Sequence, residues 1–145
     1  MSRKALYAIA AMAAVAAIAA YVISVQFLRS AEWGLEVYAD GRRVATLTLR
    51  WLEARSAPMV VGSVEYKCVP LSEVLRACGI SEVKSVVATG ADGYTREISG
   101  AFLNQTYVAI VPEGRRSAEG PLRLIVVGLS KKYWVKFLVR VEVRG

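Results

Sequence analysis

The stretch from Gly120 to Gly145 reads GPLRLIVVGLSKKYWVKFLVRVEVRG, and it decides the fold expected of this chain. Leu122 to Val127 is an apolar run interrupted only by Arg123, which predicts a strand buried on both faces. Tyr133 to Val143 alternates apolar and polar residues, which predicts a second strand with one face in the core. The two strands are therefore expected to form a pair joined by a short basic and aromatic loop.

That loop is the first candidate for a site. Its lysines could bind a phosphate or an anionic headgroup, and a solvated charged face is the alternative. Trp134 and Leu138 interrupt the polar face of the predicted strand, and such a break can mark a partner surface. The loop contributes Lys132, Tyr133 and Trp134 to the candidate ligand or partner surface, and the lysines that could bind a phosphate are Lys131, Lys132 and Lys136.

Two further features complete the candidate site. Arg123 must be paired or must face a cleft, because it lies inside an apolar strand. A salt bridge to Asp92 or another acid and the binding of an anion are equal alternatives. Asp92-Gly93-Tyr94 could present a carboxylate and a phenol to a ligand. The favoured interpretation is a turn, in which Asp92 accepts backbone hydrogen bonds and Tyr94 packs back on the sheet.

Residues 1–29 are predicted to be a cytoplasmic stub followed by a transmembrane anchor. Ala5 to Leu28 contain no charged residue and are long enough, as a helix, to cross a hydrocarbon core of about 30 Å. A cleavable signal peptide is the competing interpretation, since Ala16 to Ala20 offer small-residue cleavage sites. Arg3 and Lys4 favour a cytoplasmic N-terminus, so residues 30–145 are expected outside the cytoplasm, at the cell membrane.

The alanine-rich segment could also pack against a membrane protein or a second copy of this chain, although alanine is equally a simple helix former. The net charge is +7, but Arg3, Lys4 and Arg29 flank the anchor. The remaining excess is mild and does not favour nucleic acid. The chain has no histidine, the commonest general base and metal ligand. We therefore predict no catalytic residue and no metal site.

Residues 30–145 are predicted to form a β-rich α+β domain with two short helices and about seven strands. Asp40-Gly41 between alternating runs predicts a β-hairpin. The helices are expected at Leu49 to Arg55, capped by Thr48, and at Pro70 to Ala77, followed by Gly79. Strands are also expected at 59–67 as a single strand, 83–89, 95–98 and 106–111, and a polar loop at 113–119.

The two cysteines are expected to be free, buried thiols. Cys68 and Cys78 lie at opposite ends of the second predicted helix, so helical rise separates them by about 12 Å. A disulfide requires Cα atoms within about 7 Å of each other.

The order of these signals resembles the oxidoreductase molybdopterin-binding domain, the fold of sulfite oxidase and its bacterial relatives, over residues 33 to 143. The residues that carry the resemblance are Val69-Pro70-Leu71-Ser72-Glu73-Val74-Leu75 with Gly79, Asp92-Gly93-Tyr94, Gly120-Pro121-Leu122-Arg123-Leu124, and Val135-Lys136 with Val141-Glu142-Val143.

The resemblance implies a pterin site that uses Arg123 and Lys136. In catalytic members a cysteine upstream of the Val-Pro-Leu helix holds the metal, and histidines and arginines help to hold the pterin. Here that upstream segment is short, and Cys68 occupies a position where the family commonly has glycine. We therefore expect no cofactor, with molybdopterin as the alternative and Cys68 as its metal ligand only in that case.

Three functional hypotheses follow. The first is a membrane-anchored extracytoplasmic binding or interaction module without catalytic activity, such as an accessory subunit of a membrane complex. The second is a molybdopterin-dependent oxidoreductase or electron-transfer component that uses Cys68, Arg123 and Lys136. The third is a pilin-like filament subunit, since Ser2-Arg3-Lys4 precede an alanine-rich segment.

Overall fold

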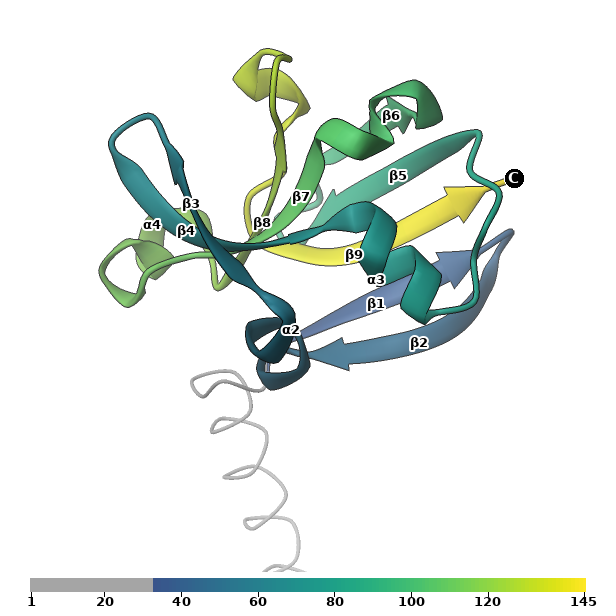
Figure 1. Ribbon diagram of the computed structural model, residues 1–145, viewed down its shortest axis with the longest axis horizontal. Coiled ribbons are helices and arrows are strands. Elements are labelled where there is room, and N and C mark those ends of the chain that lie inside the picture. Colours follow the sequence, from purple (N-terminus) through teal and green to yellow (C-terminus); the bar gives the residue numbers. More distant parts are fainter. Residues whose placement is uncertain (1–32) are drawn as a thin grey trace, which may run out of the picture. The chain divides into compact units, whose positions relative to one another are not determined.

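The computed structural model describes residues 33–145 (Figure 1), so the predicted anchor at residues 1–29 lies outside the described residues. The segments behind the signal-peptide and pilin-like alternatives also lie outside them. Within the described part, no helix has the length and apolar character needed to span a bilayer. Residues 33–145 form an α+β domain with nine strands in two sheets, so the β-rich fold class is confirmed for this range.

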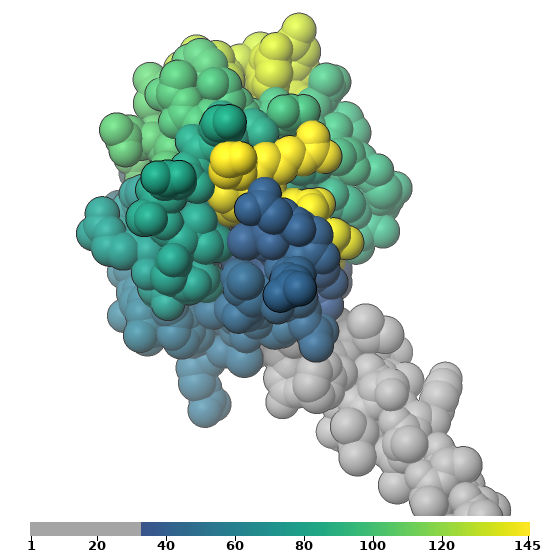
Figure 2. Space-filling view, turned by 90° about the vertical axis from the view of Figure 1, so that its right-hand side faces the viewer, coloured from purple at the N-terminus to yellow at the C-terminus, as the bar shows by residue number. Residues whose placement is uncertain are grey.

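The first sheet has five strands in the order β2-β1-β9-β5-β6. Its strands are β1 Gly34–Ala39, β2 Arg42–Thr48, β5 Ser85–Gly90, β6 Thr95–Ser99 and β9 Leu138–Arg144. β9 is the central strand and pairs parallel to β1 and antiparallel to β5. Figure 2 shows the end of β9, in yellow, between the blue of β1 and β2 and the green of β5 and β6.

The hairpin predicted at Asp40-Gly41 is confirmed. β1 and β2 pair antiparallel on either side of it. Asp40 has a φ of 49° and Gly41 a φ of 85°, the positive values that a type I′ hairpin turn requires at both central positions.

The second sheet has four strands in the order β3-β4-β7-β8. Its strands are β3 Ala57–Val61, β4 Val64–Pro70, β7 Thr106–Ile110 and β8 Leu122–Val126. The single strand predicted for 59–67 is wrong, because this segment is an antiparallel hairpin. The chain reverses at Gly62-Ser63, where Gly62 has a φ of 64°. All five residues of β8 are buried, which confirms the strand predicted to be covered on both faces.

Both predicted helices are present. α2 spans Leu49–Arg55, and the Thr48 hydroxyl accepts a hydrogen bond of 3.1 Å from the backbone N–H of Trp51. α3 spans Leu71–Ala77 and is followed by Gly79, whose φ is 78°. The shorter turns are the 3₁₀ helices η1 Gly100–Gln105, η2 Glu113–Arg115 and η3 Lys131–Tyr133, and the α-helix α4 Arg116–Glu119. The predicted polar loop at 113–119 is thus helical.

The main core contains side chains from both sheets and from α2 and α3. A second, smaller cluster includes Tyr66, Cys68 and Ile125. Alternate residues of β8 serve the two clusters: Leu122, Leu124 and Val126 belong to the main core, whereas Ile125 belongs to the smaller one.

The second strand of the C-terminal pair differs from the prediction. β9 begins at Leu138 and not at Tyr133, and Val135 forms only an isolated bridge with Leu124. Phe137 has a φ of 53°, and this left-handed residue, together with a bulge opposite Thr89 and Gly90, shifts the alternation of side chains. Leu138 is therefore fully buried in the core. Its assignment to a partner surface is wrong.

Both cysteines are free, as predicted. Cys68 is buried in the smaller cluster, but Cys78 is only half-buried, so the expected burial is confirmed for Cys68 alone.

Candidate ligand pocket

A pocket of about 430 Å³ opens where the loop before β9 meets β8 and the β5–β6 turn. We call it the basic pocket. All seven of its lining residues were selected from the sequence or from the family resemblance. The lining residues are Asp92, Tyr94, Arg123, Lys131, Lys132, Trp134 and Lys136. Residues from three separate stretches of the chain are thus brought together.

Side-chain hydrogen bonds fix the loop that carries the lysines. The Tyr94 hydroxyl donates to the backbone carbonyl of Lys132 and accepts from Nε of Arg96 at 2.6 Å. The indole N–H of Trp134 donates to the carbonyl of Val126 at 2.9 Å. The loop is therefore attached to the β5–β6 turn on one side and to β8 on the other, which holds the lysines at the pocket.

The Asp92 carboxylate belongs to a turn, as expected. Its Oδ1 accepts a hydrogen bond of 3.1 Å from the backbone N–H of Tyr94, and Gly93 has a φ of 87°. A Cβ at Gly90 would approach the Asp92 carboxylate to 2.7 Å and the Lys136 carbonyl to 2.4 Å. The turn is thus packed tightly against the basic loop. Tyr94 does not pack back on the sheet; it reaches across to the loop instead.

Tyr133 does not line the pocket, although the sequence placed it in the same surface. Its ring lies 5.4 Å from Nζ of Lys132 and 5.9 Å from Cζ of Arg96, measured to the ring centroid. These are distances at which a cation is attracted to an aromatic face. Tyr133 therefore belongs to the support of the loop.

Arg123 is buried and is paired with an acid, but the acid is Glu119 and not Asp92. One carboxylate oxygen of Glu119 accepts from Arg123 and from the Tyr66 hydroxyl, the latter at 2.8 Å. The other oxygen accepts from Nε of Arg115 at 2.8 Å. Glu119 is only 3% exposed, so this carboxylate is an internal partner of Arg123. Glu119 is not among the residues predicted from the sequence, because its position reads as a polar loop; its spacing of four residues from Arg123 was the available signal.

The protonation state of Glu119 follows from these contacts. Burial by itself would raise the pKa of its carboxyl group. Hydrogen bonds from Arg115 and Tyr66 and the charge of Arg123 outweigh burial, so the pKa of Glu119 is lowered and the group is ionised at neutral pH. Burial, followed by the hydrogen bond to Glu119, raises the pKa of Tyr66, which therefore remains protonated as a donor.

Arg123 keeps one unused donor. Its Nε is buried without a hydrogen-bond partner among residues 33–145, and its guanidinium carbon lies 5.0 Å from the centroid of the Trp134 ring. A buried donor without a partner costs free energy, on the order of 1 to 3 kcal/mol. The pocket wall thus contains a guanidinium that is held by Glu119 and is not fully satisfied by it.

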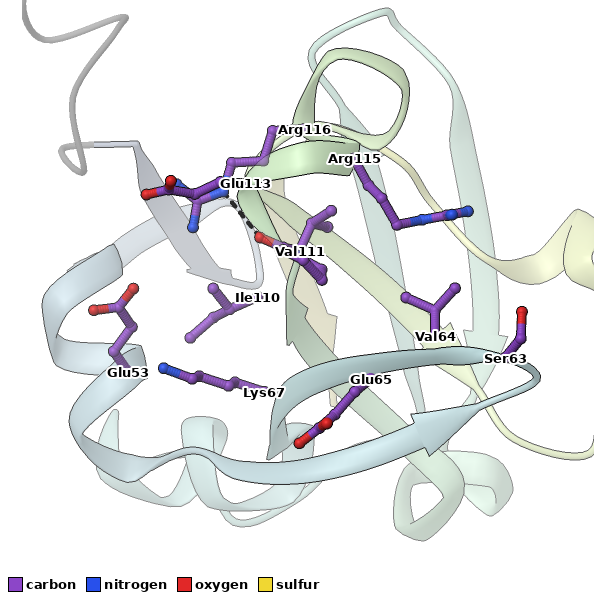
Figure 3. Close-up of a pocket in the computed structure, with 11 residues that line it drawn as sticks. Glu53, Ser63, Val64, Glu65, Lys67, Ile110, Val111, Glu113, Arg115 and Arg116 are labelled. Atoms are coloured by element: carbon purple, nitrogen blue, oxygen red, sulfur yellow. Dashed lines mark hydrogen bonds between the residues drawn. The ribbon is translucent and has the colours of Figure 1, made fainter.

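A second pocket, of about 640 Å³, lies between α2, the β3–β4 hairpin and the segment after β7 (Figure 3). Its charged lining residues are Glu53, Glu65, Lys67, Glu113, Arg115 and Arg116. Arg116 donates from Nε to the carbonyl of Val111 at 2.9 Å, the dashed line in Figure 3. Because three acids and three bases line it, this pocket has no dominant charge. It is the weaker candidate for an ionic ligand.

The fold agrees with the result of comparing the chain with known families. The family of the oxidoreductase molybdopterin binding domain matches residues 35–145. The chain belongs to this family. No curated protein matches the sequence.

Among solved structures, this molybdopterin-binding-type domain is similar to the sulfane dehydrogenase SoxCD from Paracoccus pantotrophus. The TM-score is 0.60 and the sequence identity is 18%. The match covers 79% of this chain and 39% of the SoxCD chain. At this identity the likeness concerns the fold alone, and the present chain corresponds to well under half of its structural relative.

The residues of this family member do not fit molybdenum held through a thiolate. Neither cysteine lines the basic pocket. Cys68 lies in the smaller core cluster, and burial raises the pKa of its thiol to about 11, which disfavours the thiolate that binds a metal. Residues 33–145 contain no group of three or more Cys, Asp or Glu side chains suited to a metal ion. The cations of the pocket, in contrast, fit the phosphate of a ligand.

Proposed function

We propose that this molybdopterin-binding-type domain is a non-catalytic binding module that holds a phosphate-bearing ligand in the basic pocket. The observation that carries this proposal is the convergence of Lys131, Lys132, Lys136 and Arg123 on one pocket that also contains an indole. Ammonium and guanidinium groups donate charge-assisted hydrogen bonds to phosphate oxygens, and the Trp134 ring offers a face for stacking.

The chemistry around the pocket supports binding without catalysis. The chain has no histidine, and the only acid that lines the pocket, Asp92, is hydrogen-bonded within its own turn. General acid–base catalysis needs a group that can exchange a proton with a bound ligand. The lining supplies cations and a phenol whose hydroxyl is already used by Lys132 and Arg96.

The proposal includes a membrane-anchored, extracytoplasmic location for the module, as an accessory subunit of a membrane complex. It rests on the uncharged run from Ala5 to Leu28 and on the cations before it. An anionic lipid headgroup and a free phosphate compound share the chemistry that the pocket recognises.

The test is titration of the full-length chain in neutral detergent with inorganic phosphate at low salt, followed by calorimetry. Saturable binding is expected. Lys136→Ala should weaken it by about three- to tenfold, since it removes one of the cations. Lys67→Ala is the matched control, because Lys67 lines the other pocket. The proposal fails if phosphate does not saturate the protein, or if both variants behave alike. Vesicles with and without an anionic lipid then distinguish a headgroup from a free compound.

A molybdopterin-dependent oxidoreductase or electron-transfer component is the second candidate, and membership of the family favours it. Protein purified from its native membrane would then contain molybdenum in a stoichiometric amount. Metal content that is unchanged in Cys68→Ser would exclude Cys68 as the ligand.

A further inference from the structure

The anion already present beside the basic pocket is a side chain of the protein itself. The Glu119 carboxylate lies behind the pocket wall and binds the guanidinium of Arg123, which lines the pocket. Glu119 does not line the pocket and is almost completely buried. Its charge is therefore fixed in place and acts on any ligand that occupies the pocket.

Three donors hold the carboxylate there. Tyr66 on β4 and Arg115 on η2 donate to it in addition to Arg123, and neither of the two lines the basic pocket. Removal of Arg123 would still leave the carboxylate with two donors. Glu119 is thus more than a counterion for one arginine; it is a permanent negative charge next to a cationic site.

This charge is large relative to the charge of the pocket. The lining carries four cations and one carboxylate, that of Asp92. Glu119 is bound directly to Arg123 of the lining and lowers the local formal charge by one more unit, to a net of two positive charges, which matches a single phosphate dianion. Arg115, the other cation bound to Glu119, does not line the basic pocket and its side chain is half-exposed, so solvent screens its charge. Without Glu119, the pocket would offer three.

We infer that Glu119 is an internal anion that limits the affinity of the basic pocket and matches it to ligands with a single phosphate group, at the expense of more highly charged ligands such as diphosphates. This inference rests on the proposed function, because it concerns what the same pocket selects. A purely structural role is the competing explanation, and the two explanations predict opposite changes in affinity when Glu119 is replaced. Loss of a structural support weakens binding, whereas loss of an internal competitor strengthens it.

The experiment is a double-mutant cycle on the full-length chain with inorganic phosphate and with pyrophosphate as probes. The variants are Glu119→Gln, Arg123→Gln and the double variant. Glutamine keeps the size of each residue approximately and can still hydrogen-bond. We expect Glu119→Gln to bind phosphate about tenfold more tightly than the unmodified chain at low salt, and to favour pyrophosphate more strongly still. Arg123→Gln should bind about tenfold more weakly, and the double variant should lie close to the unmodified chain.

The comparison of Arg123→Gln with the double variant keeps the test valid if Glu119→Gln alone does not fold, since neither of those two leaves the Arg123 guanidinium buried without an acid. Circular dichroism verifies that each variant is folded. The gain should shrink as salt is added, because screening acts on charge and not on packing.

The outcomes separate the two proposals. If the unmodified chain binds phosphate but Glu119→Gln and the double variant bind no more tightly than their parents, the inference about Glu119 is overturned and the proposed function stands. If phosphate saturates none of the four proteins, both the proposed function and the inference about Glu119 are overturned. If binding appears only when Glu119 is replaced, the result supports Glu119 as an internal anion that limits affinity, and it overturns the function proposed for the native pocket.

Discussion

Gly120 lies against Phe137 so closely that a Cβ at position 120 would approach the Cα of Phe137 to 2.7 Å. The backbone N–H of Phe137 also donates to the carbonyl of Glu119 at 2.8 Å. Both residues have positive φ, 76° at Gly120 and 53° at Phe137. This contact joins the start of β8 to the start of β9, and it lies one residue from the acid that binds Arg123.

Gly120→Ala should therefore lower the free energy of unfolding by about 2 to 4 kcal/mol, because the new methyl group meets backbone atoms and the positive φ disfavours a side chain. Urea unfolding measures the change. Gly114→Ala is the control, since a Cβ there would meet nothing within 4 Å and its φ is not in the left-handed region. Equal effects of the two substitutions would contradict the close contact.

Leu138→Ala should destabilise the domain by about 2 to 5 kcal/mol, since it removes a fully buried side chain from the main core. Val127→Ala, at a residue that is 44% exposed, should change stability by no more than about 0.5 kcal/mol. Thermal unfolding of both variants checks the assignment. If Leu138→Ala left the stability unchanged, the burial of Leu138 would be contradicted and the surface position expected from the sequence pattern would be supported.

Stability should depend on pH through Glu119. Its pKa is lowered from 4.5 in the folded chain, so the unfolded chain binds a proton more readily. The stability that this carboxylate contributes is present above about pH 4.5 and is lost as the pH falls through the lower pKa of the folded state. Urea unfolding of the unmodified chain and of Glu119→Gln, at neutral pH and at successively lower pH, measures it. The stability difference between the two proteins should narrow on acidification; a constant difference would show that the carboxylate is not ionised preferentially by folding.

The two thiols should react at different rates with a thiol reagent at neutral pH. Burial raises the pKa of both thiols, that of Cys68 to about 11, but Cys78 is only half-buried. In Cys78→Ser, the remaining thiol should react slowly in the native protein and rapidly in urea. In Cys68→Ser, the remaining Cys78 thiol should react at a moderate rate in the native protein. Rapid modification of Cys68 in the native protein would contradict its burial and would again make it a candidate metal ligand.

Several elements could be predicted because local chemistry determines them. Asp40 and Gly41 are residue types that accept two successive positive φ angles, which is what the hairpin turn uses. The strand β8 is apolar except for Arg123, so both of its faces must be covered in any fold. The Gly62-Ser63 turn was missed, although Gly-Ser is a pair that two-residue hairpins use. The surrounding valines continue the apolar pattern across it, so that pattern alone predicts one strand where there are two.

The beginning of β9 could not be predicted, because a left-handed phenylalanine and a bulge together turn Leu138 into the core, while Val141 and Val143 face the core as predicted. Phenylalanine gives no local indication of a positive φ; the close approach of Gly120 accompanies it, and that contact is tertiary. The pattern alone therefore left Leu138 outside and Phe137 inside.

The residues that line the candidate site could be predicted from the sequence, whereas the residues that hold Arg123 in place could not. Lysines, Arg123 and Trp134 attract notice through their chemistry, and the family resemblance selected Arg123 and Lys136. Tyr66, by contrast, lies 57 positions from Arg123 and reads as an ordinary strand residue. Arg115 and Arg123 are each four residues from Glu119, but only the long-range folding of the chain brings the phenol of Tyr66 to the same carboxylate.

The central place of β9 bears on how this domain is made. β9 is the last of the nine described strands to be synthesised, yet β1 and β5 both need it as a neighbour; the indole N–H of Trp33 bonds to Leu138 across 105 positions of the chain. During translation, the β1–β2 and β5–β6 hairpins emerge from the ribosome with the edges that will flank β9 still unpaired. Such edges pair readily with other chains. The nascent protein is thus most exposed to misassembly immediately before its final strand is released.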